Sequence, residues 1–146
     1  MADARDTAKD LAARVVTGIH RAVFRTSNGR IGNRGYGMPV LELTTTGRKT
    51  GKRRTTMLTS PVQDDGNVVL VASYGGDDRH PTWFLNLRDD PKVEITMEGR
   101  TRAMRARVAS PEEKAALWPR VVAAHKGYGE YQTRTKRDIP LVILEL

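Results

Sequence analysis

Hydrophobic and polar residues alternate along much of the chain after residue 38, and a period of two residues is typical of β-strands. Six segments show this alternation or a short apolar run, at residues 39–46, 54–61, 68–73, 92–98, 100–109 and 139–146. Turn-forming pairs such as Asp65-Gly66 and Glu98-Gly99 separate neighbouring segments. Because tight turns join antiparallel strands, the pattern predicts a mainly β protein, most economically a closed or split barrel.

Helical periodicity interrupts this pattern at both ends of the chain. Apolar residues recur every four positions within residues 4–24, which predicts an N-terminal amphipathic helix that docks on the domain or rests on anionic lipid. A glycine-rich loop follows, so we divide one globular unit into residues 1–38 and 39–146. Two more helices are predicted, one between Pro81 and Pro91 and one that begins at Ser110, a favourable N-cap.

Charge narrows the classes of partner. The net charge of +8 predicts an anionic partner, either nucleic acid, a membrane surface or a polyanionic small molecule, although solubility alone is an alternative explanation. The chain has no cysteine, which excludes disulfides and thiolate chemistry, and its three histidines lack the spacing of metal ligands. Without a signal peptide or an apolar run of spanning length, we expect a cytoplasmic protein and no metal site.

The densest positive charge lies on a predicted hairpin turn. The stretch "TTTGRKTGKRRTT", residues 44–56, contains five basic residues and no acid: Arg48, Lys49, Lys52, Arg53 and Arg54. A tight turn exposes backbone N–H groups, and arginine and lysine add charge-assisted hydrogen bonds to phosphate or carboxylate. The turn is therefore predicted to bind an anion.

Other candidate residues follow the strand that ends near residue 73. Tyr74 precedes Gly75 and Gly76, which would let the backbone approach a ligand closely. Tyr128 and Tyr131 share one face if their segment is helical, and their polar, glycine-bearing surroundings are poor for core packing. We interpret this pair as a contact for a planar ligand or a source of phenolic protons. Two tryptophans and one phenylalanine, Trp83, Phe84 and Trp118, are expected in the core.

Three blocks of the chain are similar to a known family: "LELTTTGRKTGKRRTTMLTS", "VASYGGDDRHPTWFLNLRDDPKVEI" and "RARVASPEEKAALWPRVVAAHKGYGEYQTRTKRDIPLVILEL". Together they resemble the deazaflavin-dependent nitroreductase and quinone reductase family of actinobacteria. The resemblance implies an α+β fold based on a six-stranded antiparallel split β-barrel of the FMN-binding-like type. It also implies coenzyme F-420, an 8-hydroxy-5-deazaflavin with a phospholactyl–oligoglutamate tail, whose negative charge would explain the basic hairpin.

The same resemblance assigns roles to residues. The tail would contact Arg48, Lys49, Thr50, Gly51 and Arg54. The ring would lie near the loop of Ser73, Tyr74, Gly75 and Gly76, and Asn86 would reach the cofactor. Tyr128, Tyr131 and Ser73 are the predicted catalytic residues, which position the substrate oxygen or relay a proton. The implied reaction transfers a hydride from reduced coenzyme F-420 to a quinone-like, nitro or enone acceptor.

Three alternatives stay open on the sequence alone. One is an FMN-dependent oxidoreductase on the same barrel, and another is a carrier that holds the deazaflavin without turnover. The third is a basic nucleic-acid-binding protein, whose affinity would fall steeply with salt. The favoured interpretation has a small-molecule acceptor and no specific nucleic acid. It allows peripheral contact of the N-terminal helix with the inner face of the membrane, and it leaves the oligomeric state open.

Overall fold

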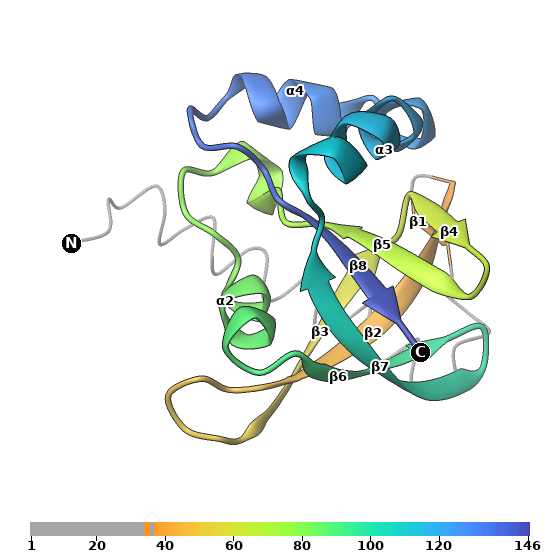
Figure 1. Cartoon of the computed structure of the whole chain (residues 1–146), viewed down its shortest axis with the longest axis vertical. Coiled ribbons are helices and arrows are strands. Elements are labelled where there is room, and N and C mark those ends of the chain that lie inside the picture. The colour runs from red at the N-terminus through yellow and green to blue at the C-terminus, as the bar shows by residue number, and fades with distance from the viewer. Residues whose placement is uncertain (1–33, 36) are drawn as a thin grey trace.

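The structure of the chain is a computed structural model that describes residues 34–35 and 37–146 (Figure 1). The predicted amphipathic helix at residues 4–24 and most of the glycine-rich loop lie outside the described residues. The proposed division into residues 1–38 and 39–146 therefore stays a prediction.

Eight β-strands form one antiparallel sheet in the described part of the chain. The strands are β1 Arg34–Gly35, β2 Met38–Thr46, β3 Arg53–Thr59, β4 Val62–Asp64, β5 Asn67–Val71, β6 Lys92–Met97, β7 Arg100–Val108 and β8 Leu141–Glu145. Their order across the sheet is β1-β2-β6-β7-β8-β5-β4, and β3 pairs with β2 outside this path. All six strands predicted from the alternation are confirmed, as β2, β3, β5, β6, β7 and β8.

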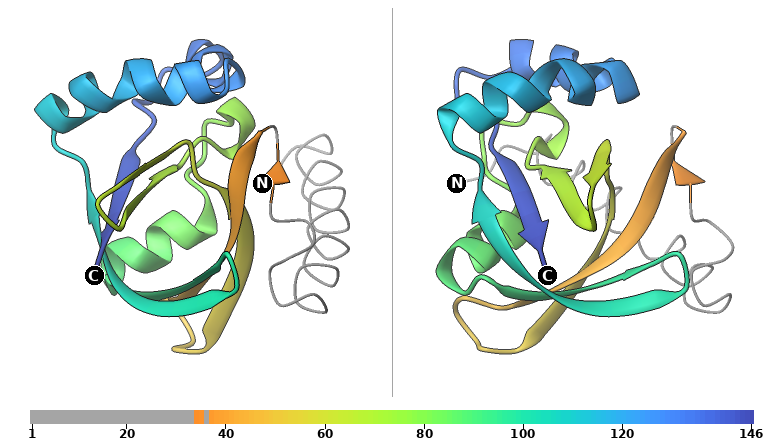
Figure 2. Two further views of the ribbon diagram at one scale, coloured as in Figure 1. Left: turned by 90° about the vertical axis from the view of Figure 1, so that its right-hand side faces the viewer. Right: turned by 45° about the vertical axis from the view of Figure 1, so that its right-hand side comes forward.

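The predicted six-stranded barrel is wrong in its strand number and in its closure. β1 and β4 add two strands, and no ladder between described residues joins the two ends of the sheet. These strands contain only two and three residues, which is too few for an alternation to be visible in the sequence. The sheet nevertheless coils strongly around its interior (Figure 2), as twisted strands do when one face is buried.

Two predicted turns are confirmed with the backbone that such turns require. Asp65 and Gly66 have φ of +51° and +84° and join β4 to β5. Glu98 and Gly99 have φ of +53° and +76° and join β6 to β7. Two successive residues with positive φ match the right-handed twist of a two-residue hairpin.

Two apolar clusters share the neighbouring strands β8 and β5. Val68 and Leu70 face a cluster inside the coiled sheet, whereas Val69 and Val71 face a second cluster. β8 divides in the same way, with Val142 and Leu144 in the first cluster and Leu141 and Ile143 in the second. Both strands are thus buried on both faces, which explains their continuous apolar runs in the sequence.

Helices cover these two clusters. α2, Thr82–Asp89, adds Trp83, Phe84 and Leu87 to the first cluster. α3, Pro111–Ala124, and α4, Gly127–Thr133, lie together across one end of the sheet and cover the second (Figure 2). None of the described helices is both long and apolar enough to cross a membrane.

The expected surroundings of one tyrosine are corrected by this arrangement. The segment around Tyr128 is helical, but the side chain of Tyr128 is only 6% exposed and belongs to the second cluster. Its setting is therefore an apolar core, because α4 lays this face against the sheet. The core positions of Trp83 and Phe84 are confirmed, and Trp118 is half-buried against the second cluster.

The start of α3 is attached to the sheet through one carboxylate. Ser110 and Glu113 form a capping box, in which each side chain accepts a hydrogen bond from the other residue's backbone N–H. Arg107 of β7 donates to both carboxylate oxygens of Glu113, at 2.6 and 2.8 Å, and to Glu145 of β8 at 2.7 Å. The bonds from Arg107, followed by the backbone of Ser110, lower the pKa of Glu113 from 4.5 to about 2.

We expect Glu113 to make the free energy of unfolding depend on pH in the acid range. Because the folded carboxylate stays ionised to lower pH than the unfolded one, its contribution is complete above pH 4.5 and is lost as the pH falls towards 2. The difference in unfolding free energy between the natural chain and Glu113→Gln should therefore narrow across this interval, as measured by urea titrations at several pH values. Glu112→Gln, on the same helical turn, is the control. A difference that stays constant down to pH 2 would contradict the prediction.

Candidate functional site

The hairpin turn between β2 and β3, residues 47–52, is here called the basic loop. Its backbone closes on itself, because Gly47 N donates to Lys52 O at 2.7 Å and Gly51 N donates to Gly47 O at 2.8 Å. Gly51 has φ of +71°, a conformation that glycine adopts without steric cost. The strands on either side are paired up to Thr46 and Arg53. The backbone of the loop is therefore held in one conformation, and its exposed side chains project from it into solvent.

A buried asparagine joins the basic loop to α2. Asn86 Oδ1 accepts a hydrogen bond from Arg48 N at 3.1 Å, and Asn86 Nδ2 donates to Thr45 Oγ1 at 3.2 Å. The side chain is only 3% exposed. A buried amide with partners at both ends is costly to disrupt. This geometry makes Asn86 a residue that places the loop, and its predicted contact with the cofactor stays a prediction.

The charges of the basic loop and of the start of β3 are largely unbalanced. Arg53 lies 3.4 Å from Glu94 of β6, an acid that the local sequence did not reveal. The other four cations are exposed and have no ion-pair partner in the part of the chain that the structure describes: Arg48, Lys49, Lys52 and Arg54. Four neighbouring cations repel one another, and a polyanion would relieve that repulsion.

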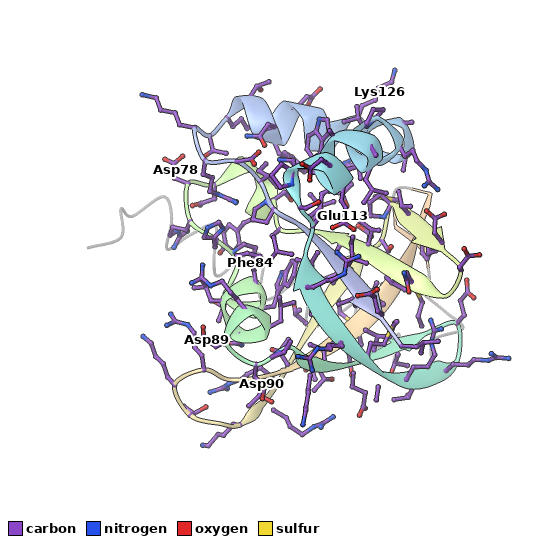
Figure 3. The ribbon with its side chains drawn as sticks, in the orientation of Figure 1. Asp78, Phe84, Asp89, Asp90, Glu113 and Lys126 are labelled. Carbon is purple, nitrogen blue, oxygen red and sulfur yellow. The ribbon has the colours of Figure 1, made fainter. Side chains whose placement is uncertain are left out.

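Backbone donors accompany these cations. The amides of Gly47, Arg48, Gly51 and Lys52 all have acceptors within the protein. Lys49 N and Thr50 N have none among the described residues, so the exposed tip of the loop offers two further donors to an anion. Asp89 and Asp90 lie at the end of α2 (Figure 3), but neither forms an ion pair with the basic loop.

The second group of predicted residues follows β5. The segment Tyr74–Gly76 forms a short 3₁₀ turn, η1, in which Tyr74, Gly75 and Gly76 have φ of +45°, +64° and +85°. A left-handed tyrosine is strained, and such strain persists only where surrounding contacts hold it. The Arg79 guanidinium lies 5.3 Å from the centre of the Tyr74 ring. Ser73, which precedes the turn, is 7% exposed.

Gly76 brings this turn against α4. A Cβ atom at Gly76 would lie 2.8 Å from Tyr131 O and 3.0 Å from the Cβ atom of Arg134. Only glycine allows both this approach and the positive φ. The residues predicted for the ring side and those predicted for the substrate side are thus brought together.

The two tyrosines of α4 differ in their surroundings. The Tyr128 hydroxyl hydrogen bonds to Thr59 Oγ1 of β3 at 3.1 Å and lies 3.9 Å from Met38 Sδ. Burial raises the pKa of Tyr128 above its usual value of 10. Tyr131 is half-buried, and its ring meets that of Tyr128 edge-on, with 6.0 Å between centroids. Tyr131 is therefore better placed to meet a ligand, and Tyr128 is better placed to support it.

The two groups lie at opposite ends of one side of the molecule. Figure 1 shows α4 at one end, the hairpin of β2 and β3 at the other, and η1 and α2 between them. η1 packs against α4, and α2 contacts β2 near the basic loop. A ligand that reached from the tyrosines to the basic loop would need a compact ring and a long anionic extension.

Three residues of this region were not predicted from the sequence. Thr45 and Thr59 act through hydroxyl groups that face distant partners, at Asn86 and Tyr128. Arg137 lies in the basic stretch "RTKR", residues 134–137, and it donates to backbone carbonyls after β5. No local pattern marks these contacts, since each joins residues that are far apart in the sequence.

Comparison with known proteins decides the family. A family model described as F420H(2)-dependent quinone reductase matches residues 16–146 of this chain. The chain belongs to the F420H(2)-dependent quinone reductase family. This confirms the resemblance stated from the sequence and makes the chain an oxidoreductase whose implied cofactor is coenzyme F-420, in place of the FMN alternative.

Individual relatives of this family agree with the assignment. An F420H(2)-dependent quinone reductase from Mycobacterium tuberculosis H37Rv is 42% identical over 130 residues, which is 86% of this chain and 87% of the relative. A solved F420-H2-dependent reductase superposes with a TM-score of 0.67 at 39% identity, over 73% of this chain and 94% of that one. A structure described as a domain-swapped dimer gives a TM-score of 0.69 at 31% identity, over 98% and 100%.

The residues present fit the cofactor that the F420H(2)-dependent family implies. A tail of phosphate and carboxylate groups needs several separate cations and N–H donors along an exposed surface. The basic loop and its flanking strand provide four cations without ion-pair partners among the described residues, as well as the amides of Lys49 and Thr50. The donor set is thus larger than a single phosphate requires.

We expect Asn86→Ala to loosen the basic loop. The variant leaves Arg48 N and Thr45 Oγ1 without their buried partner, which should lower the free energy of unfolding by about 1–3 kcal/mol. Hydrogen exchange provides the specific test, because the Arg48 amide should exchange faster in the variant. The Ser60 amide, which bonds to Pro39 O outside the loop, serves as the internal control. Equal protection of Arg48 in both proteins would refute the role of Asn86.

Proposed function

We propose that this chain binds coenzyme F-420 with its tail on the basic loop and its ring beside η1 and α4, and reduces a quinone-like acceptor there. The main support for the proposal is a set of four cations that have no acidic partner among the described residues: Arg48, Lys49, Lys52 and Arg54. Phosphate and glutamate carboxylates of the tail would supply the missing negative charge. Thr50 completes the tail site through its backbone N–H, and Gly51 contributes the positive φ that shapes the loop.

The ring end of the proposed site depends on backbone shape. Ser73, Tyr74, Gly75 and Gly76 present an uncommon left-handed backbone beside α4. A planar ring could approach closely beside Gly75, which has no side chain, whereas α4 already fills the space at Gly76. When bound in its reduced form, the cofactor supplies a hydride to the acceptor.

A proton must accompany the hydride, since a quinone takes up one hydride and one proton to become a quinol. Tyr131 is the proposed donor, because its half-buried hydroxyl has no hydrogen-bond partner among the described residues. Tyr128 holds the Tyr131 ring by edge-on packing and keeps its own proton through its raised pKa. Ser73 could orient the acceptor oxygen from the opposite side. Nitro and enone compounds stay further candidate acceptors for the same chemistry.

The cellular setting is a separate part of the proposal. The open, coiled sheet is a variant of the split β-barrel, and most of residues 1–38 precede its first strands in the chain. We place the enzyme in the cytoplasm, where residues 4–24 would contact the inner face of the membrane. The amphipathic pattern of that segment supports this placement, because a quinone acceptor dissolved in lipid would be reached there.

Arg54→Ala should weaken coenzyme F-420 binding by roughly ten-fold, since it removes one charge-assisted contact with the tail. Fluorescence titration of the cofactor measures the effect, and raising the salt concentration should reduce the difference. Arg53→Ala is the matched control, because it removes the same charge from a side chain that already faces Glu94. Equal effects of the two variants would contradict a specific tail site.

Tyr131→Phe should lower kcat by about ten-fold or more, because it removes the proposed proton donor, and should change cofactor affinity by less than about two-fold. Tyr128→Phe should also lower kcat more than cofactor affinity, but its effect on kcat should be smaller than that of Tyr131→Phe. It should in addition lower the free energy of unfolding by about 1 kcal/mol through loss of the Thr59 bond. Steady-state assays and urea titrations separate the two effects. Unchanged rates in both variants would remove the tyrosines from the mechanism.

A further inference from the structure

The register between β5 and β8 brings two distant loops together. Val71 pairs with Leu141, so the chain that leaves β5 begins beside the chain that enters β8. One more backbone bond, from Ala72 N to Pro140 O at 3.0 Å, extends this pairing. Residues 72–80, which include the proposed ring site, therefore lie against residues 134–140.

One side chain occupies this junction. Arg137 Nε donates to Asp77 O at 2.9 Å, and Nη2 donates to Ser73 O at 2.8 Å. Both Nη atoms also donate to Ala72 O at 3.1 Å, and Nη1 lies 3.3 Å from His80 Nδ1. A single guanidinium thus holds both ends of the strained turn between Ser73 and Asp77.

Among the amino acids, only arginine has enough N–H donors, in the right planar arrangement, to bond to all of these acceptors at once. The planar guanidinium presents five N–H groups in a rigid fork, whereas lysine has one ammonium group. A guanidinium cannot accept a hydrogen bond, so His80 Nδ1 must accept from it and the imidazole must be neutral. Burial, followed by the charges of Arg137 and Arg88, lowers the pKa of His80, which agrees with that state. The pKa of Arg137 itself is lowered by burial, although Asp77 and Asp78 oppose this effect.

Neighbouring residues strengthen the same junction. Thr135 Oγ1 donates to Asp78 Oδ1 at 2.7 Å, and Arg134 Nη1 reaches Gly75 O at 3.4 Å. Figure 3 shows Asp78 beside η1, on the side where the chain approaches β8. The turn is therefore held from one side by α4 and from the other by this segment.

We propose that Arg137 is a positioning residue that fixes the loop of Ser73–Gly76 in the geometry needed to hold the cofactor ring. This inference rests on the proposed function, because it assumes that the ring lies at that loop. Its direct physical basis is the bonding of one guanidinium to the carbonyls of Ala72, Ser73 and Asp77 around a left-handed tyrosine. The basic loop lies at the other end of the molecule, so Arg137 acts on the ring and leaves the tail contacts unchanged.

The test compares Arg137→Lys with Lys136→Gln, a change at an exposed neighbouring cation for which the structure gives no contact with the loop. Two probes are titrated by fluorescence, coenzyme F-420 and the deazaflavin riboside without its tail. Arg137→Lys should weaken the binding of both probes by the same factor of about ten, and should lower kcat by about ten- to a hundred-fold. The ratio of the two affinities, which reports the tail, should stay within about two-fold of the natural value.

Hydrogen exchange separates this inference from the proposed function. The Gly76 amide, which bonds to Ser73 O, should exchange faster in Arg137→Lys and stay protected in Lys136→Gln. If the natural chain binds neither probe, the proposed function fails, whereas the exchange result still decides what Arg137 does to the loop. The inference is overturned if exchange, kcat and both affinities match those of Lys136→Gln. It is also overturned if Arg137→Lys loses cooperative unfolding, because the guanidinium would then hold the whole domain.

Discussion

The pairing of β5 with β8 is the contact on which the rest of the structure depends. Both strands are buried on both faces, so the sheet needs apolar cover on each side. The coiled sheet and α2 provide that cover within, and α3 and α4 provide it outside. The same pairing places the turn after β5 beside the segment that enters β8. One packing requirement therefore creates the core and also assembles the proposed ring site at its edge.

The basic loop follows a different physical principle. Its side chains contribute little to the core, and its cations repel one another in the absence of an anion. The protein holds this charge in place with backbone bonds across the loop and with the buried amide of Asn86. A binding surface of this kind is preorganised, so a polyanionic tail would lose its own freedom without also having to order the loop. Family membership implies coenzyme F-420 as the cofactor, and a tail of negative charge would match this surface.

Much of the fold could be predicted from local pattern. The six longer strands, the two positive-φ hairpin turns and the capped start of α3 all have signals within a few residues. β1 and β4 could not be predicted, because two or three residues show no periodicity. The glycine-bearing neighbours of Tyr128 predicted a polar setting, but the packing of α4 on the sheet buries this side chain in the second cluster. The acid opposite Arg53 was likewise invisible, because Glu94 approaches it from another strand.

Local patterns were enough to predict the six longer strands, the two hairpin turns, the concentration of positive charge and the family, since each of these depends on residues that are close together or on their order along the chain. Tertiary structure alone decided which of those cations keeps no acidic partner among the described residues, and that Asn86 holds the basic loop. It also decided that Thr59 meets Tyr128 and that Arg137 bonds to the turn after β5. The physical reason is distance along the chain. A contact between residues 38 to 69 positions apart depends on strand register and packing, which no local pattern encodes.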